Sequence, residues 1–96
     1  ENYRSRAGQV VVFEGRCVRV LPSRRGTAYA VMFEDGGWTE GFKLVIRTGF
    51  VSEVGGAHFI RSLAGRTLRV RGLITHSRVF GYEITVTTRS MILGVS

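Results

Sequence analysis

Two adjacent arginines in a short turn have the residue types and spacing that best suit ligand chemistry in this sequence. Arg24 and Arg25 lie in the segment PSRRG, between a proline and a glycine, with no acidic neighbour. A guanidinium group keeps its charge at any working pH, pairs bidentately with phosphate and stacks on flat rings. The segment therefore predicts a phosphate-binding turn at residues 22–26.

Arginine dominates the charged residues of the whole chain. The 96 residues include 13 arginines, one lysine (Lys43) and one aspartate (Asp35), and the formal net charge is +7 at pH 7. Such a charge attracts polyanions, and nucleic acids are the first candidates for a small basic β-rich domain. Solubility or coding bias would also account for excess arginine, and this alternative stays open.

Aromatic side chains near charged segments are candidate stacking platforms for bases. Phe80 lies in the loop HSRVFG with His76 and Arg78, and Trp38 lies in the turn EDGGWTE. Each base stacked on such a ring adds about 1 to 3 kcal/mol of binding free energy. Packing over a barrel end is the alternative for both rings, and acidic neighbours of Trp38 favour that alternative by repelling phosphate.

Residues suited to catalysis or metal binding are scarce. Metal-assisted phosphodiester cleavage needs clustered carboxylates, whereas the single aspartate lies in a turn and the glutamates are mostly scattered. His58, His76 and Cys17 do not have the spacing of zinc ligands. We therefore expect no enzyme activity, no cofactor and no metal. Cys17, the single cysteine, is expected to be a buried structural thiol.

Length and composition favour one soluble domain. The chain has room for a single core, and 44% hydrophobic with 22% charged residues is ordinary for a globular protein. No apolar run approaches the roughly 18 residues of a membrane span, so no membrane partner is expected. Residues 1–8 are expected to form a flexible basic arm and residues 9–96 the domain. The absence of an initiator methionine favours an excised or processed domain and leaves its compartment open.

Apolar alternation and turn residues predict the elements that position these side chains. Strands are expected at residues 9–21, 27–34, 42–47, 66–75 and 82–87, with one more short strand at 90–95. The first is expected to bend at Gly15, because a glycine within a strand commonly marks a bulge. The second and third form a hairpin with Gly36 and Gly37 at its tip. A helix of two turns begins near Gly56, with Ser52 as the candidate cap.

The resulting order, β-β-β-α-β-β with a long bent first strand, resembles an OB-fold, the five-stranded Greek-key barrel. The resemblance covers nearly the whole chain and depends on the segments VVVFEGRCVRV, GTAYAVMFE, GFKLVI and AGRTLRVRGLIT. The phrase GRTLRVRG is similar to a G-x-x-V-x-V-x-G segment of bacterial OB domains. The resemblance implies an all-β barrel with one short helix that binds oligonucleotides.

Strand alternation divides the side chains between two faces. The core face is expected to hold Tyr29, Val31, Phe33, Phe42, Leu44 and Ile46. The opposite, outward face is then formed by Ala28, Ala30, Met32, Lys43, Val45 and Arg47. In an OB-fold this face binds oligonucleotides, between the loops at 22–26 and 76–81. Arg69 and Arg71 also point outward, and pairing with Glu14 or Glu83 is the alternative role of both.

The sequence thus predicts a module that binds single-stranded DNA or RNA with low sequence specificity. The predicted contact residues are Arg24, Arg25, Lys43, Arg47, Arg71, Arg78 and Phe80. The alternative is an adaptor or assembly domain of a larger protein, which binds a protein partner or a second copy through the same face or an open edge. Salt distinguishes the two, because phosphate contacts weaken steeply as salt is added.

Overall fold

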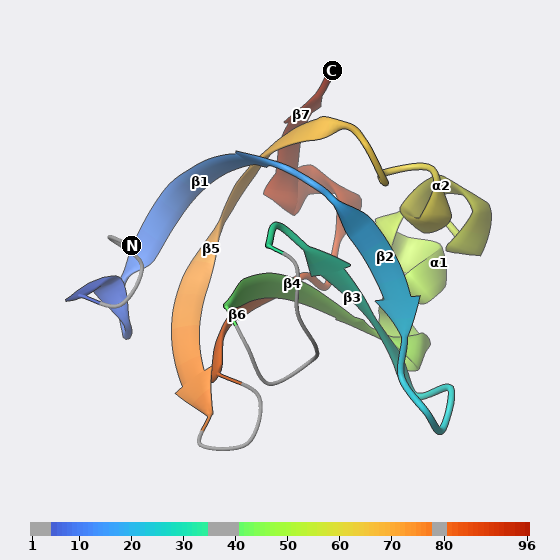
Figure 1. Ribbon diagram of the computed structural model, residues 1–96, viewed down its shortest axis with the longest axis horizontal. Coiled ribbons are helices and arrows are strands. Elements are labelled where there is room, and N and C mark those ends of the chain that lie inside the picture. The colour runs from blue at the N-terminus through green and yellow to red at the C-terminus, as the bar shows by residue number, and fades with distance from the viewer. Residues whose placement is uncertain (1–4, 35–40, 78–80) are drawn as a thin grey trace.

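The chain folds into a mostly β structure whose sheet curls into a half-barrel (Figure 1). The computed structural model describes residues 5–34, 41–77 and 81–96. Its strands are β1 (Val10–Arg16), β2 (Arg19–Pro22), β3 (Ala28–Met32), β4 (Phe42–Arg47), β5 (Thr67–Ser77), β6 (Gly81–Thr85) and β7 (Ile92–Val95). Its helical segments are η2 (Thr48–Phe50), α1 (Val51–Val54), α2 (Ala57–Arg61) and η3 (Arg89–Met91).

The strands follow the order β1-β5-β6-β4-β3-β2, and β7 pairs with β5 beside this path. β4 and β6 run parallel, while the other described pairs are antiparallel. Two residues, Cys17 and Val18, separate β1 from β2. One continuous segment of chain therefore supplies both ends of the path, and Figure 1 shows it as an arc across the top of the sheet.

The first strand bends at Cys17 and Val18, so the prediction of a bend at Gly15 is wrong. The N–H of Cys17 donates to the carbonyl of Arg66 (2.8 Å), and the N–H of Val18 donates to the carbonyl of Met32 (2.8 Å). The backbone thus changes partner between these residues. Gly15 serves another purpose, because a Cβ at this position would lie 2.8 Å from the Phe13 ring.

The core lies on the inner face of the curled sheet. Val31, Phe42, Leu44 and Ile46 belong to the buried core, as predicted, whereas Tyr29 and Phe33 of the predicted set are partly buried and pack against it. Three phenylalanine rings close one part of the core, with ring centroids 4.7 Å apart for Phe13 and Phe33 and 4.5 Å apart for Phe13 and Phe42. Close ring packing of this kind adds to the stabilisation from burial alone.

Cys17 is fully buried, as predicted for a structural thiol. Burial raises the pKa of this thiol, while backbone hydrogen bonds oppose the increase. The thiol therefore stays protonated at neutral pH and contributes as a small apolar side chain.

The helix predicted to begin near Gly56 is confirmed in position as α2, although it has only 5 residues and a separate short helix, α1, precedes it. Gly55 and Gly56 separate α1 from α2 with φ angles of 127° and 95°, a region that favours glycine and interrupts a helix. Ser52 lies within α1 and provides no side-chain cap, so the prediction of Ser52 as the cap is wrong. Ile60 and Leu63 are fully buried, and the helices lie at one end of the sheet, where Arg61 of α2 donates to the Tyr29 hydroxyl of β3 (Figure 1).

The remaining strand predictions agree with the structure in position but differ in count. Seven strands are described where five or six were expected, because the first strand is divided and β7 (Ile92–Val95) adds to β5. The predicted hairpin of β3 and β4 is confirmed by its antiparallel register, and its tip lies outside the described residues. Among the described residues, no helix is long and apolar enough to cross a membrane.

Candidate functional site

The sheet face opposite the core is buried over most of β3 and β4. Alternation correctly predicts which residues share this face, but the expectation that they are open to solvent is wrong. Ala30, Met32 and Lys43 are at most 1% exposed, and only Arg47 of the predicted set is exposed. Cross-strand neighbours help to cover the short side chains, since Ala30 lies opposite both Leu21 and Val45.

Lys43 is a buried cation, and the prediction of an exposed phosphate contact at this position is wrong. Its register places it between Met32 of β3 and Glu83 of β6. Burial lowers the pKa of Lys43, while the negative charges of Glu83 and then Glu34 oppose the decrease. The charge of Lys43 thus stays inside the protein, opposite that of a buried carboxylate.

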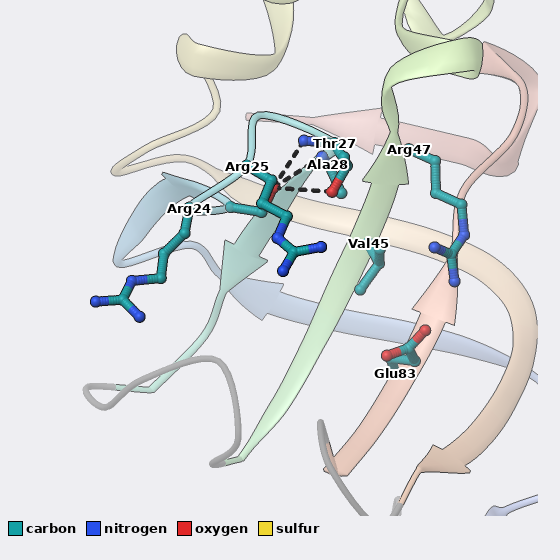
Figure 2. A pocket seen from close by; sticks show the side chains of 8 residues that line it. Arg24, Arg25, Thr27, Ala28, Val45, Arg47 and Glu83 are labelled. Atoms are coloured by element: carbon teal, nitrogen blue, oxygen red, sulfur yellow. Dashed lines mark hydrogen bonds between the residues drawn. The ribbon is translucent and has the colours of Figure 1, made fainter.

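A pocket of about 350 Å³ opens on the same face of the sheet, beside the buried part (Figure 2). Its described lining residues are Ser23, Arg24, Arg25, Thr27, Ala28, Val45, Arg47 and Glu83. Ala28 and Val45 provide a small apolar surface between the charged groups. Figure 2 shows the side chains of Arg25 and Arg47 on either side of Val45, whereas the side chain of Arg24 points away from it.

The turn between β2 and β3 is held by a dense set of hydrogen bonds to Ser23. The Ser23 Oγ atom accepts from the N–H groups of Thr27 (2.8 Å) and Ala28 (3.2 Å), as the dashed lines of Figure 2 show. The N–H of Ser23 donates to the carbonyl of Ala28 (2.8 Å). Gly26 has a φ angle of 69°, which lets the turn close tightly. Arg24 and Arg25 are therefore displayed on a preorganised turn.

Thr48 joins this turn to the end of β4, where Arg47 lies. Its side-chain Oγ1 atom donates to the carbonyl of Gly26 (2.9 Å), and its N–H donates to the carbonyl of Thr27 (2.9 Å). Because Arg47 directly precedes Thr48, these bonds fix its position relative to the turn. Sequence reasoning missed Ser23, Thr27 and Thr48, although a Ser and a Thr that flank RRG were a visible signal of a stabilised turn.

The pocket also contains one carboxylate that sequence reasoning did not assign to it. Glu83 on β6 is 7% exposed and lies directly opposite Lys43. Its Oε2 atom accepts a hydrogen bond from the Thr85 Oγ1 atom (3.3 Å). Among the described lining residues Glu83 is the single acidic one, and no local sequence pattern indicates the parallel pairing that brings it beside β4.

Three of the seven predicted contact residues meet at the pocket: Arg24, Arg25 and Arg47. Arg71 is exposed on β5, opposite Val12 of β1, and is not among the described lining residues. The predicted contacts Arg78 and Phe80, and the stacking candidate Trp38, lie outside the described residues.

Other arginines have neighbours that indicate structural roles. The Arg61 Nη2 atom donates to the Tyr29 hydroxyl (3.0 Å), and the Arg89 guanidinium lies 4.4 Å from the Phe59 ring centroid. Arg69 lies directly opposite Glu14 in the register of β1 and β5, as the cross-strand alternative requires. The arginine excess is therefore divided between the pocket and the support of the fold.

The pocket can bind a ligand without covalent chemistry. Guanidinium groups attract an anion, Ala28 and Val45 accept an apolar or flat group, and the Glu83 carboxylate accepts hydrogen bonds from a donor. No cluster of three or more histidine, cysteine or acidic side chains that could hold a metal ion occurs in the described parts of the chain.

Comparisons with protein families, with curated proteins and with solved structures found no match to this chain.

Proposed function

We propose that this chain is an OB-type module that binds single-stranded nucleic acid through the pocket of Arg24, Arg25 and Arg47. The observation that carries the proposal is that these three arginines line one pocket, with Arg25 and Arg47 on either side of Val45. Guanidinium groups pair with backbone phosphates, and an apolar surface between them accepts a base or a sugar. Sequence preference is low overall, because phosphate contacts read no sequence.

The strand connectivity supports the OB-type part of the proposal. When β1 and β2 are counted as one bent strand, five strands follow a path that begins and ends with that strand. β6 lies between β4 and β5, which is a Greek-key crossover, and the helices lie between β4 and β5 in the chain. The turn at 23–27 then joins the first two strands, where OB-folds have a binding loop.

The shape of the pocket favours a single strand over a duplex. Its volume of about 350 Å³ suits one small group, and its apolar lining of Ala28 and Val45 can accept an exposed base. Bases in a duplex have their faces covered by stacking, whereas an unpaired base can turn outward into a pocket. The proposed ligand is therefore a segment of single-stranded DNA or RNA.

Fluorescence anisotropy with short labelled oligonucleotides, single- and double-stranded, at two salt concentrations tests this proposal. The double variant Arg24→Ala, Arg25→Ala should bind the single strand more weakly and with a shallower salt dependence. If both arginines contact phosphates, the slope of log K against log salt should decrease by about 1.4, from about 0.7 per contact.

The matched control is the double variant Arg16→Ala, Arg69→Ala. Both side chains are exposed on β1 and β5, outside the described pocket lining, and their removal changes the net charge by the same amount. Equal losses of affinity in the two double variants would show that only the overall charge matters, and the proposed site would be wrong.

Assembly with a protein partner is a second candidate function, favoured by the exposed edge of β1. Val10 and Val12 are 61% and 52% exposed, and β1 pairs only with β5 among the described strands. An unpaired edge with apolar side chains can add a strand from another chain. Light scattering at high salt, for the unmodified protein and for Val12→Lys, tests whether this edge self-associates.

A further inference from the structure

We infer that the pocket prefers guanine at one nucleotide, through hydrogen bonds from the N1–H and N2 amino groups of the base to the carboxylate of Glu83. The inference deepens the proposed function, because it requires that single-stranded nucleic acid binds in this pocket. It concerns the one position of the strand that enters the pocket, while neighbouring positions remain unselected.

The presence of Glu83 is the observation that a pure phosphate site does not explain. A carboxylate repels phosphate, yet this one lies in the same pocket as Arg25 and Arg47. It is 7% exposed, so it is held within the pocket wall and does not extend into solvent. The ligand that this arrangement fits has a negative part for the arginines and a hydrogen-bond donor for the carboxylate.

The surroundings of Glu83 hold its carboxylate in place. Thr85 donates a hydrogen bond to the Oε2 atom (3.3 Å), and the cation of Lys43 lies directly opposite in the strand register. The hydrogen bond fixes the orientation of one carboxylate oxygen, and the strand register fixes where the group lies. Figure 2 shows this carboxylate below Val45 on β6, apart from the turn that displays Arg25. A base over Val45 can therefore reach the carboxylate while its phosphate lies near the arginines.

Guanine is the base whose edge matches a carboxylate. Its N1–H and N2 amino group are adjacent donors, so each can bond to one of the two carboxylate oxygens. Adenine and cytosine each place an amino donor beside a ring nitrogen acceptor, which would face the second oxygen and repel it. Thymine and uracil place one N–H between two carbonyl oxygens. Guanine alone among these bases therefore pairs with both oxygens without repulsion.

The decisive experiment uses the unmodified protein and a series of labelled thymidine oligonucleotides that differ at one central base. Anisotropy titrations compare guanine, hypoxanthine, adenine, cytosine and thymine at that position. One bidentate pair discriminates by about 5- to 150-fold, so guanine should bind at least about fivefold more tightly than thymine. Hypoxanthine has no N2 amino group and should lose much of this preference.

The variant Glu83→Gln assigns the preference to the side chain. Glutamine keeps the shape of glutamate but replaces one acceptor oxygen by a donor, so the preference for guanine over hypoxanthine should disappear. The guanine strand should therefore lose more affinity than the all-thymine strand, because thymine has no adjacent pair of donors for the carboxylate. A structural role alone would not change base preference. If the variant does not fold, the base series on the unmodified protein decides alone.

The outcomes separate this inference from the proposed function. Equal affinity for all five central bases, together with a loss of binding in Arg24→Ala, Arg25→Ala, would overturn the guanine inference and support the arginine site. A guanine preference that persists in a folded Glu83→Gln protein would overturn the role of Glu83. Absence of binding to every strand would refute the proposed function itself.

Discussion

Replacing Lys43 by methionine tests whether the buried charges of β4 and β6 depend on each other. Lys43 is fully buried, Glu83 is 7% exposed, and the two residues lie opposite one another in a parallel pair of central strands. Methionine preserves most of the length and apolar volume of lysine but removes the cation. Glu83 would then remain as a buried carboxylate without the cation opposite it.

The expected loss of stability is large for a domain of this size. Removing one partner of a buried ion pair commonly costs about 3 to 5 kcal/mol, because the remaining charge keeps its desolvation penalty. The whole free energy of unfolding of a small domain is roughly 5 to 15 kcal/mol. Lys43→Met should therefore lose at least about a fifth of the stability and, if the domain is marginally stable, fail to fold at moderate temperature.

The matching double variant Lys43→Met, Glu83→Leu separates charge from packing. Replacement of a buried pair by apolar residues of similar volume is often neutral or stabilising, so the double variant should recover most of the loss. Urea unfolding monitored by circular dichroism measures the stability of the unmodified protein, of Lys43→Met, of Glu83→Leu and of the double variant. The dependence of the two charges on each other is refuted if the free energy of unfolding of Lys43→Met lies within about 1 kcal/mol of that of the unmodified protein. It is also refuted if the double variant is no more stable than Lys43→Met.

Two further predictions concern the turn and the pH dependence of stability. Ser23→Ala removes the acceptor of two backbone N–H groups and should cost about 1 kcal/mol of turn stability, which weakens oligonucleotide binding by roughly fivefold without changing the salt slope. Ser62→Ala, which loses a bond to the Phe59 carbonyl (2.6 Å), is the control, and equal binding of both variants would contradict the preorganised turn. The pKa of Lys43 is lowered in the folded state, so between that value and the ordinary 10.5 the unfolded chain binds more protons and stability rises with pH. The raised pKa of Cys17 acts in the opposite direction above its ordinary value of 9.0, and it does so in every variant. The free energy of unfolding of the unmodified protein minus that of Lys43→Met, Glu83→Leu therefore isolates the effect of Lys43. If this difference does not change with pH over the window, the prediction for Lys43 is wrong.

The sequence was sufficient to predict properties that depend on neighbours in the chain. β4 (Phe42–Arg47) is predicted with the bounds that the structure gives, because its alternation of side chains is uninterrupted and Gly41 precedes it. The same alternation correctly places Val31, Leu44 and Ile46 in the hydrophobic core cluster, which does not include Ala30, Met32 or Val45. These features depend on a period of two residues, which is fully present in the sequence.

Properties that depend on distant segments could not be predicted in the same way. Alternation shows which side chains share a face but not what covers that face, so Lys43 was expected to be exposed although it is buried. The bend at Cys17 depends on Arg66, and the support of the turn depends on Thr48, each contributed from a distant part of the chain. Both are contacts of the folded sheet that no local pattern encodes.

The buried pair and the pocket are connected through one strand register. Lys43 and Glu83 face each other because β4 and β6 run parallel, and the same register places the Glu83 carboxylate on the wall of the arginine pocket. If Glu83 served only to neutralise Lys43, an apolar pair would do as well for stability and would leave a better phosphate site. A ligand that carries a hydrogen-bond donor would give the Glu83 carboxylate a function in the pocket that it shares with Arg47. The double variant Lys43→Met, Glu83→Leu distinguishes these explanations, because it should fold and bind phosphate groups while showing no preference for guanine.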